Sequence, residues 1–173
     1  MINGIPEIIN DFNMYLTGNK LIGLTGEVTL PDFEGITETI SGPGILGEIE
    51  TVVTGRYGSM EQEIPFRIVN KDLCKMINPG TPVDLTLRGS QQYTVASTGA
   101  VDYMGMRIVF RGRCKKISLG TVKQGGAMDS AVTLELTYIL IEIDGEKKIE
   151  LDKLNGIFRV NGIDLLEKVR KFC

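Results

Sequence analysis

Apolar and polar side chains alternate along much of the chain with a period of two, which is typical of β-strands that bury one face. The pattern is clearest in residues 132–143, where Val132, Leu134 and Leu136 alternate with Thr133 and Glu135. The next two residues, Asp-Gly, are typical of a two-residue hairpin turn. Residues 147–151 are therefore expected to pair back as the second strand of a hairpin.

Similar segments occur throughout the rest of the chain. Residues 12–16 and 21–30 flank a Gly-Asn pair and predict an early hairpin. Further strands are expected at 33–40, 61–69, 83–87, 93–96, 104–113 and 115–119. The sequence therefore predicts many short strands.

Two segments have helical spacing instead. Asn70 is placed to cap a helix over residues 70–78, which Pro79 would end. At the other end of the chain, Asp164 and Glu167 have capping-box spacing. The expected C-terminal helix carries an apolar stripe of Leu165, Leu166, Val169 and Phe172. Many strands with two short helices predict a mainly β (α+β) domain that spans residues 1–173.

Residues 41–60 stand out as a long excursion between strands. The stretch Ser-Gly-Pro-Gly-Ile-Leu-Gly at 41–47 is the most turn-rich of the chain, and a β-branched run follows it. Long loops inside compact domains are uncommon and tend to be functional. We expect a long loop here, partly extended and partly mobile, with a functional role.

The sequence lacks the residues that several kinds of catalytic, metal and nucleotide site require. The chain has no histidine, which removes Ser-His and Cys-His nucleophiles and histidine zinc sites, and its three cysteines lack metal-ligand spacing. The glycines at 42, 44 and 47 match a dinucleotide fingerprint, but Glu48 and Glu50 would repel phosphate and no helix follows. We expect no enzymatic activity, cofactor or metal.

One catalytic alternative is a glycoside hydrolase. Glu61 and Glu63 would lie on one strand face about 7 Å apart, which is within the range for paired catalytic carboxylates. Glutamates that share a strand face are more often simply solvated, and no other feature of the sequence favours catalysis.

Charge and hydropathy exclude two classes of partner. The net charge is −3, so the chain has no general attraction for nucleic acid. Arg107 and Arg111 belong to a local basic cluster and would share one strand face, opposite Ile108 and Phe110. No apolar run approaches the roughly 20 residues that cross a bilayer. We expect no stable membrane association and synthesis in the cytoplasm.

The order of segments resembles the major tail tube family of contractile-tailed phages and phage-tail-like (R-type) bacteriocins. Residues 26–31 resemble its Val-Thr-Leu-Pro strand end, and 42–47 its glycine-rich turn. Residues 110–120 are similar to its Arg-Gly-basic strand, and 132–138 to its Val-Thr-Leu segment. The likeness is greatest in the C-terminal stretches 143–145, 150–152, 154–155 and 160–164.

This resemblance implies an antiparallel β-sandwich or half-barrel flanked by helix. It also implies that six chains form a ring and that rings stack into a tube with a channel for DNA or ions. The implied partners are copies of the chain, a contractile sheath protein, and baseplate, tape-measure and tail-terminator proteins, with DNA only in transit. Assembly would take place in the cytoplasm of a bacterial host, and the product would be part of a virion tail or tail-like particle.

The resemblance also makes particular residues candidates for each surface. The contacts between rings or subunits are expected in the 41–60 segment, at Ile45, Leu46, Ile49, Val52, Val53, Arg56 and Tyr57. The candidates that face the channel are Glu61, Glu63, Arg67, Arg107 and Arg111.

Two other functions remain open at this point. The chain could be a tube-like ring protein of a type VI secretion system, which shares the ring but exports it. It could also be a monomeric ligand-binding β-domain.

Overall fold

The computed structural model describes residues 4–173, so residues 1–3 of the expected single domain lie outside the described residues. Most of the chain is extended. The strands of the larger sheet are β1 (Gly4–Leu16), β2 (Asn19–Lys20), β5 (Glu61–Phe66), β6 (Val83–Val95), β7 (Val101–Ser118), β8 (Ser130–Ile143), β9 (Glu146–Asp152), β10 (Ile157–Val160) and β11 (Ile163–Asp164). A smaller sheet consists of β3 (Gly35–Ser41) and β4 (Glu48–Tyr57), and the helices are α1 (Lys71–Met76) and α2 (Glu167–Arg170).

All strand pairs are antiparallel, which confirms the predicted mainly β class. The large sheet has the order β11-β10-β9-β8-β7-β6-β1-β2, and β5 pairs with β8 outside that row. Within residues 4–173 the sheet does not close into a barrel. Strands β6 and β7 are longer than expected, because each one joins two segments that the sequence pattern separates.

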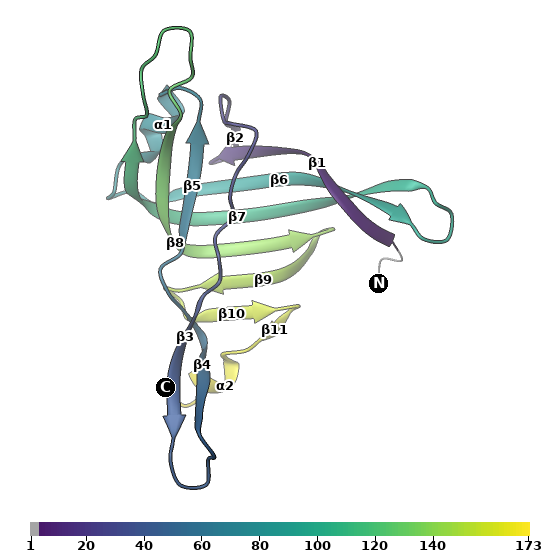
Figure 1. Cartoon of the computed structure of the whole chain (residues 1–173), viewed down its shortest axis with the longest axis vertical. Helices are drawn as coiled ribbons and strands as arrows, with labels where there is room; N and C mark the ends of the chain where they lie inside the picture. Colours follow the sequence, from purple (N-terminus) through teal and green to yellow (C-terminus); the bar gives the residue numbers. More distant parts are fainter. Residues whose placement is uncertain (1–3) are drawn as a thin grey trace.

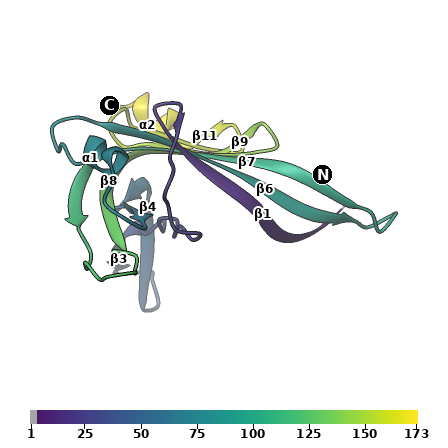
Figure 2. The same cartoon turned by 90° about the horizontal axis from the view of Figure 1, so that it is seen from above.

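The large sheet bends where β7 and β8 pair (Figures 1 and 2). One edge of β8 pairs with β7, and its other edge is shared by β5 along the first half and β9 along the second. The β7–β8 pairing has register shifts next to Gly112 and Cys114, and such bulges bend a strand. The bend turns β5 and the first half of β8 away from the remaining strands.

The hydrophobic core fills the inside of this bend. Ile64 and Phe66 of β5 are fully buried and belong to one apolar cluster with Leu85 of β6 and Phe110 of β7. Helix α1 adds its own apolar side chains to that cluster. The other buried members are Met14, Leu21, Met60, Leu73, Met76, Val83, Leu87, Ile108, Val132, Leu134, Leu136, Ile139, Leu151 and Phe158.

The strand expected at residues 21–30 is absent. Residues 21–34 instead form an irregular segment, which we call the strap, along the edge of β5 that faces away from β8. Thr25 N donates to Pro65 O at 3.2 Å, Arg67 N donates to Gly23 O at 2.9 Å, and the buried Gln62 amide donates to Thr29 O at 2.9 Å. The prediction was wrong because these backbone groups bond to a distant strand rather than to a hairpin partner.

The two predicted helices have different outcomes. The cap of α1 is confirmed, because Asn70 Oδ1 accepts a hydrogen bond from Leu73 N at 2.8 Å. Helix α2 is only four residues long, and Asp164 belongs to β11 instead of capping it. Of the predicted buried stripe only Leu166 packs against the core, whereas Phe172 is 92% exposed. A helix this short gains little from its own hydrogen bonds.

The segment 41–60 also differs from the long loop that we expected. Its residues 48–57 form β4, which pairs with β3, and only 42–47 make the connecting turn. The β-branched run Thr51, Val52, Val53 and Thr54 explains the strand, since such side chains favour extended backbone.

Gly112 provides a test of the bend. A Cβ atom there would lie 2.3 Å from the Glu135 carbonyl oxygen, which is backbone and cannot move aside. We predict that Gly112→Ala lowers the free energy of unfolding by about 1–3 kcal/mol or more in urea denaturation. Gly105→Ala on the same strand has open space around the new methyl and is the control. Equal stability of the two variants would contradict this account.

Candidate assembly surfaces

Strands β3 and β4 form a hairpin that projects from the sheet at one end of the molecule's longest axis (Figure 1). We call residues 35–57 the arm. Its strands pair from Thr37 opposite Val52 to Ser41 opposite Glu48. Among the described residues 4–173, strand β4 has no second sheet partner, and β3 pairs only with β4. The arm is therefore a two-stranded ribbon, a structure that is marginally stable in water when nothing covers it.

The two faces of the arm differ in polarity. Ile40 lies directly opposite Ile49, so these side chains share a face with the alternate residues Ile36 and Val53, and the opposed pair Glu38 and Thr51 lies between them. The four apolar side chains of this face are exposed. The opposite face carries Thr37, Thr39, Ser41, Glu48, Glu50 and the apolar Val52. The arm thus presents a mainly apolar face that no described part of its own chain covers.

The root of the arm is fixed to the large sheet. The Tyr57 ring packs edge-on against Phe33 at 5.6 Å and against Phe158 at 5.3 Å, and its burial raises the pKa of the phenol. Lys153 Nζ donates to Gly58 O at 2.8 Å, and desolvation by burial lowers the pKa of this amine. These contacts hold the base of the arm while its tip remains free.

A glycine keeps the arm close to the C-terminal segment. Gly55 has a φ of +73°, and a Cβ atom there would lie 2.7 Å from the Leu166 side chain. Leu166 itself packs against the core. The C-terminal segment therefore supports the arm from the side.

The predicted contact residues fall into two groups. Leu46, Ile49, Val52, Val53 and Arg56 are exposed along the arm, and Ile45 is half-buried in its turn. Tyr57 packs inward, so the structure gives it an anchoring position. The sequence analysis missed Ile36 and Ile40, although their alternation with threonines in residues 35–41 is the signal that could have revealed them.

The large sheet has a polar outer face opposite the core. Its charged side chains lie in opposed pairs on neighbouring strands. Arg107 Nη2 donates to Glu142 at 3.1 Å, with Arg107 Nε 2.5 Å from the other carboxylate oxygen, and Arg111 binds Asp84 at 2.7 Å. Arg159 bonds to Glu150 at 3.2 Å. Arg107 and Arg111 of the predicted basic cluster are thus neutralised by carboxylates of the adjacent strands.

A tyrosine joins two of these pairs. The Arg111 guanidinium lies over the Tyr138 ring, 4.9 Å from its centroid, and the Tyr138 hydroxyl donates to Glu150 at 3.0 Å. Burial and the hydrogen bond to Glu150 raise the pKa of Tyr138 to about 12. The phenol therefore stays protonated at neutral pH and keeps donating to the carboxylate.

The predicted channel residues do not form one cluster. Arg107 and Arg111 share the outer face of the main strands, whereas Glu61 and Glu63 lie on β5, beyond the bend. Arg67 follows β5 and lies next to the β7–β8 loop, where Met128 N donates to its carbonyl oxygen at 2.8 Å. The structure thus separates the five candidates into three places.

Lys115 connects β5 to the bend. Its ammonium contacts Glu61, and it lies 3.2 Å from Glu135. Burial opposes ionisation of Glu135, but hydrogen bonds from Ser59, Lys115 and the Met60 N–H lower the pKa of this carboxyl overall. The Glu61 carboxylate is therefore part of a structural ion pair and is not poised as a catalytic partner of Glu63.

One edge of the large sheet is open. Strand β1 pairs with β6 on one side, but β2 covers only Tyr15 and Leu16 on the other. Ile5, Ile8 and Ile9 are exposed along the uncovered part. An unpaired strand edge with apolar side chains favours pairing with another chain.

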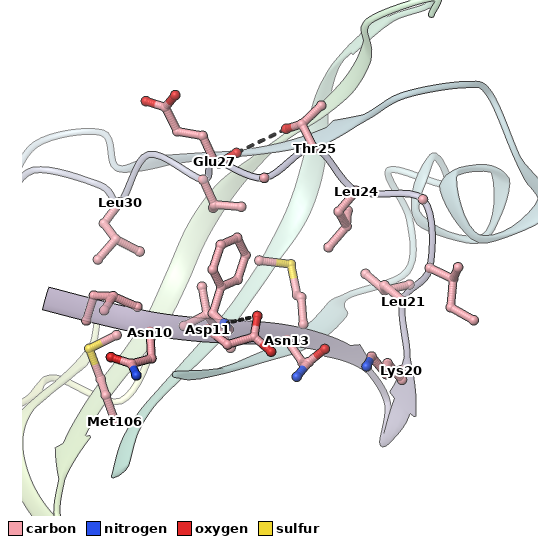
Figure 3. A pocket seen from close by; sticks show the side chains of 18 residues that line it. Asn10, Asp11, Asn13, Lys20, Leu21, Leu24, Thr25, Glu27, Leu30 and Met106 are labelled. Carbon is pink, nitrogen blue, oxygen red and sulfur yellow. Dashed lines mark hydrogen bonds between the residues drawn. The ribbon is translucent and has the colours of Figure 1, made fainter. Parts of the chain in front are cut away.

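An apolar groove lies between β1 and the strap (Figure 3), with a volume of about 830 Å³. Phe12, Leu24 and Leu30 line it, and Glu27 points away from it. The Asp11 carboxylate accepts a hydrogen bond from Phe12 N at 2.8 Å. The groove offers apolar contact area and has no paired titratable groups for chemistry.

Neither a cluster of metal-ligating side chains nor a membrane-spanning helix occurs within residues 4–173. No group of three or more histidine, cysteine or acidic residues there is arranged to hold a metal ion. No helix in this part of the chain has the length and hydropathy to span a bilayer.

A bent antiparallel sheet with a projecting amphipathic arm and an open edge defines a protein built for contacts with other chains. The model of the phage tail tube protein FII family matches residues 6–172, and the chain belongs to this family. It is therefore a structural tail tube protein, a component of a virion tail or tail-like particle.

Relatives of known name agree with this assignment. The chain is 28% identical over 168 residues to the tail tube protein of Escherichia phage P2, covering 96% of both chains. It is 26% identical over 161 residues to the major tail tube protein of Serratia phage KSP20, covering 93% of this chain and 91% of the relative.

A solved structure shares the fold. The cryo-EM structure of the sheath/tube terminator of an extracellular contractile injection system, PVC, in the extended state matches with a TM-score of 0.53. The match covers 79% of this chain and 96% of the terminator chain at 12% identity.

Tyr57 provides a test of the arm's root. We predict that Tyr57→Ala, which removes two aromatic contacts worth about 0.5–1.5 kcal/mol each, speeds amide hydrogen exchange throughout the arm. Exchange in β6–β8 should stay slow. Tyr103→Ala, at an exposed position on β7, is the matched control. An arm that exchanges at the wild-type rate after loss of Tyr57 would show that other contacts fix it.

The C-terminal segment should respond to pH through Asp164. Its hydrogen bond from Arg170, at 2.5 Å, lowers the pKa of this carboxyl in the folded protein. The stabilisation is therefore present above the unfolded pKa and is lost as the pH falls through the lower folded pKa. Amide exchange in residues 165–171 should accelerate in that acidic window, and Asp164→Asn should abolish the pH dependence. If amide exchange in residues 165–171 still accelerates at the same acidic pH in Asp164→Asn, Asp164 does not have this role.

Proposed function

We propose that this chain forms the inner tube of a contractile tail, as hexameric rings that stack around a channel for DNA or ions. The observation that carries the proposal is the apolar face of the arm, where Ile40 and Ile49 form an exposed cross-strand pair. A second copy of the chain that covered this face would remove its apolar surface from water.

Ring closure is supported by the open edge of β1. Pairing of the β1 edge with a different part of the next copy is a heterologous contact, and such contacts close into a ring when the rotation between copies permits it. The other end of the large sheet is the two-residue strand β11, so the two ends of the sheet are unlike each other. Unlike ends suit head-to-tail closure rather than a symmetric dimer.

The outer face of β6 to β10 is our candidate for the channel wall. Its Arg107, Arg111 and Arg159 are paired with carboxylates, whereas Arg88 makes no ion pair within residues 4–173, and a ring of six chains carries a negative net charge. A protein holds DNA tightly when unpaired lysines and arginines neutralise phosphates. A channel wall on which most arginines are paired with carboxylates would let DNA pass without binding it tightly.

The partners that follow from this role are the contractile sheath, the baseplate, and the tape-measure and tail-terminator proteins. Assembly would take place in the cytoplasm of a bacterial host. The same tube would serve in a phage, where DNA passes through it, or in a bacteriocin, where ions do.

The proposal is tested by electron microscopy of the concentrated purified protein. Wild type should form tubes or sixfold rings. The double variant Ile40→Thr/Ile49→Thr keeps β-branched side chains, so the arm should still fold, but assembly should fall at least about tenfold. A wild-type protein that stays monomeric at every concentration would falsify the proposal.

Val52→Thr is the control for the face of the arm. Val52 is exposed on the polar face and loses a similar apolar group in this variant. It should assemble almost as well as wild type. Equal loss in Val52→Thr and in the double variant would contradict the assignment of the contact to the apolar face.

A further inference from the structure

The two ends of the molecule's longest axis carry opposite charge. The arm occupies one end (Figure 1), and its exposed Glu38, Glu48 and Glu50 are the only charged residues between positions 36 and 55. None of the three forms an ion pair with any residue of the described chain. Residues 36–55 of the arm therefore carry only negative charge, and the arm's one basic residue, Arg56, lies at its root next to Tyr57.

The opposite end is formed by α1, the end of β5 and the β7–β8 loop at residues 119–129 (Figure 1). Backbone bonds hold these parts together, since Met128 N and Asp129 N both donate to Arg67 O, at 2.8 and 3.3 Å. We call this region the basic end. Its basic side chains that make no ion pair within residues 4–173 are Arg67, Lys71, Lys116 and Lys123.

Exposed apolar side chains lie among these charges. Ile68 is 55% exposed and Val122 is 84% exposed, and Ile117 and Leu119 are also exposed. The acidic groups in the region are Asp129, Asp72, which is paired with Lys75, and Glu63, which shares a cross-strand row with Thr133 and Lys116. The basic end thus combines apolar area with a surplus of positive charge, and the arm combines apolar area with negative charge.

We propose that the arm of one copy docks on the basic end of the next copy, so that the chain stacks head to tail along its longest axis. The inference rests on the proposed function and identifies the surface that receives the arm. Its occupant is a second copy of the same chain, because the complementary charge and apolar area are both present on one molecule.

The arrangement explains the direction of assembly. A contact between two unlike ends of a molecule leaves one of each free after every addition, so it extends without closing. Two arms would repel each other through their glutamates, and so would two basic ends, which disfavours a symmetric dimer. The apolar side chains supply contact area, and the charges select the partner.

Exposed charge pairs are individually weak and are screened by salt. The inference therefore predicts that stacking weakens as the ionic strength rises, whereas ring closure through the strand edge of β1 is less sensitive. Comparing rings with stacks across salt concentrations separates the two contacts.

Charge reversal tests the inference directly. Glu48→Lys/Glu50→Lys reverses the arm, and Lys116→Glu/Lys123→Glu reverses the basic end. At low salt, each double variant should need at least about tenfold more protein to form stacks, while rings persist. The quadruple variant restores opposite signs and should stack within a few-fold of wild type, which also rules out misfolding as the cause of the losses.

Asp102→Lys/Glu146→Lys is the control, because it makes two charge reversals on exposed side chains at the starts of β7 and β9, away from both ends (Figure 1). It should stack like wild type. A quadruple variant that stacks no better than either double variant, or double variants that stack like wild type, would overturn the inference. If neither wild type nor the control forms assemblies, this result contradicts the proposed tube function, and the docking of the arm, which rests on it, is contradicted as well.

Discussion

The apolar face of the arm cannot be buried by the chain that carries it, and this constraint shapes the rest of the molecule. The arm points away from the core along the longest axis, and its root is fixed by the Tyr57 ring between Phe33 and Phe158. A fixed root lowers the conformational entropy that a partner must remove on docking. The arm is therefore presented in a defined direction although its tip has no contacts of its own.

The bend in the large sheet decides what lies opposite the arm. The bulges next to Gly112 and Cys114 turn β5 and the first half of β8 out of the plane of the other strands. The same turn places the β7–β8 loop and α1 at the far end of the axis (Figures 1 and 2). The core inside the bend thus stabilises the fold and also separates the acidic end of the molecule from the basic one.

Local patterns in the sequence predicted much of this fold. The strand at 132–143, its Asp-Gly turn and the Asn70 cap are confirmed because each depends on neighbouring residues. The strap was misread as a strand because its hydrogen bonds reach Pro65 and Arg67, far along the chain. Similarly, the strand at 33–40 was expected but residues 41–60 were expected as a loop, since the glycine-rich turn obscured the pairing of Ile40 with Ile49.

The candidate surfaces were predicted less completely. The alternation in β7 correctly placed Arg107 and Arg111 on one face, but only the structure shows the carboxylates that neutralise them. Those partners come from β6 and β8, and cross-strand pairing depends on register, which one strand's pattern does not define. The same holds for the basic end, where Arg67, Lys116 and Lys123 come from separate parts of the chain.

The most direct test of the central claim is hydrogen–deuterium exchange of the wild-type protein, compared between free subunits and assembled tubes. In free subunits the amides of residues 36–53 should exchange quickly, because an uncovered two-stranded ribbon opens easily. In tubes they should become strongly protected, since a neighbouring chain covers the arm. Tubes in which the arm still exchanges at the rate of the free subunit would contradict the account.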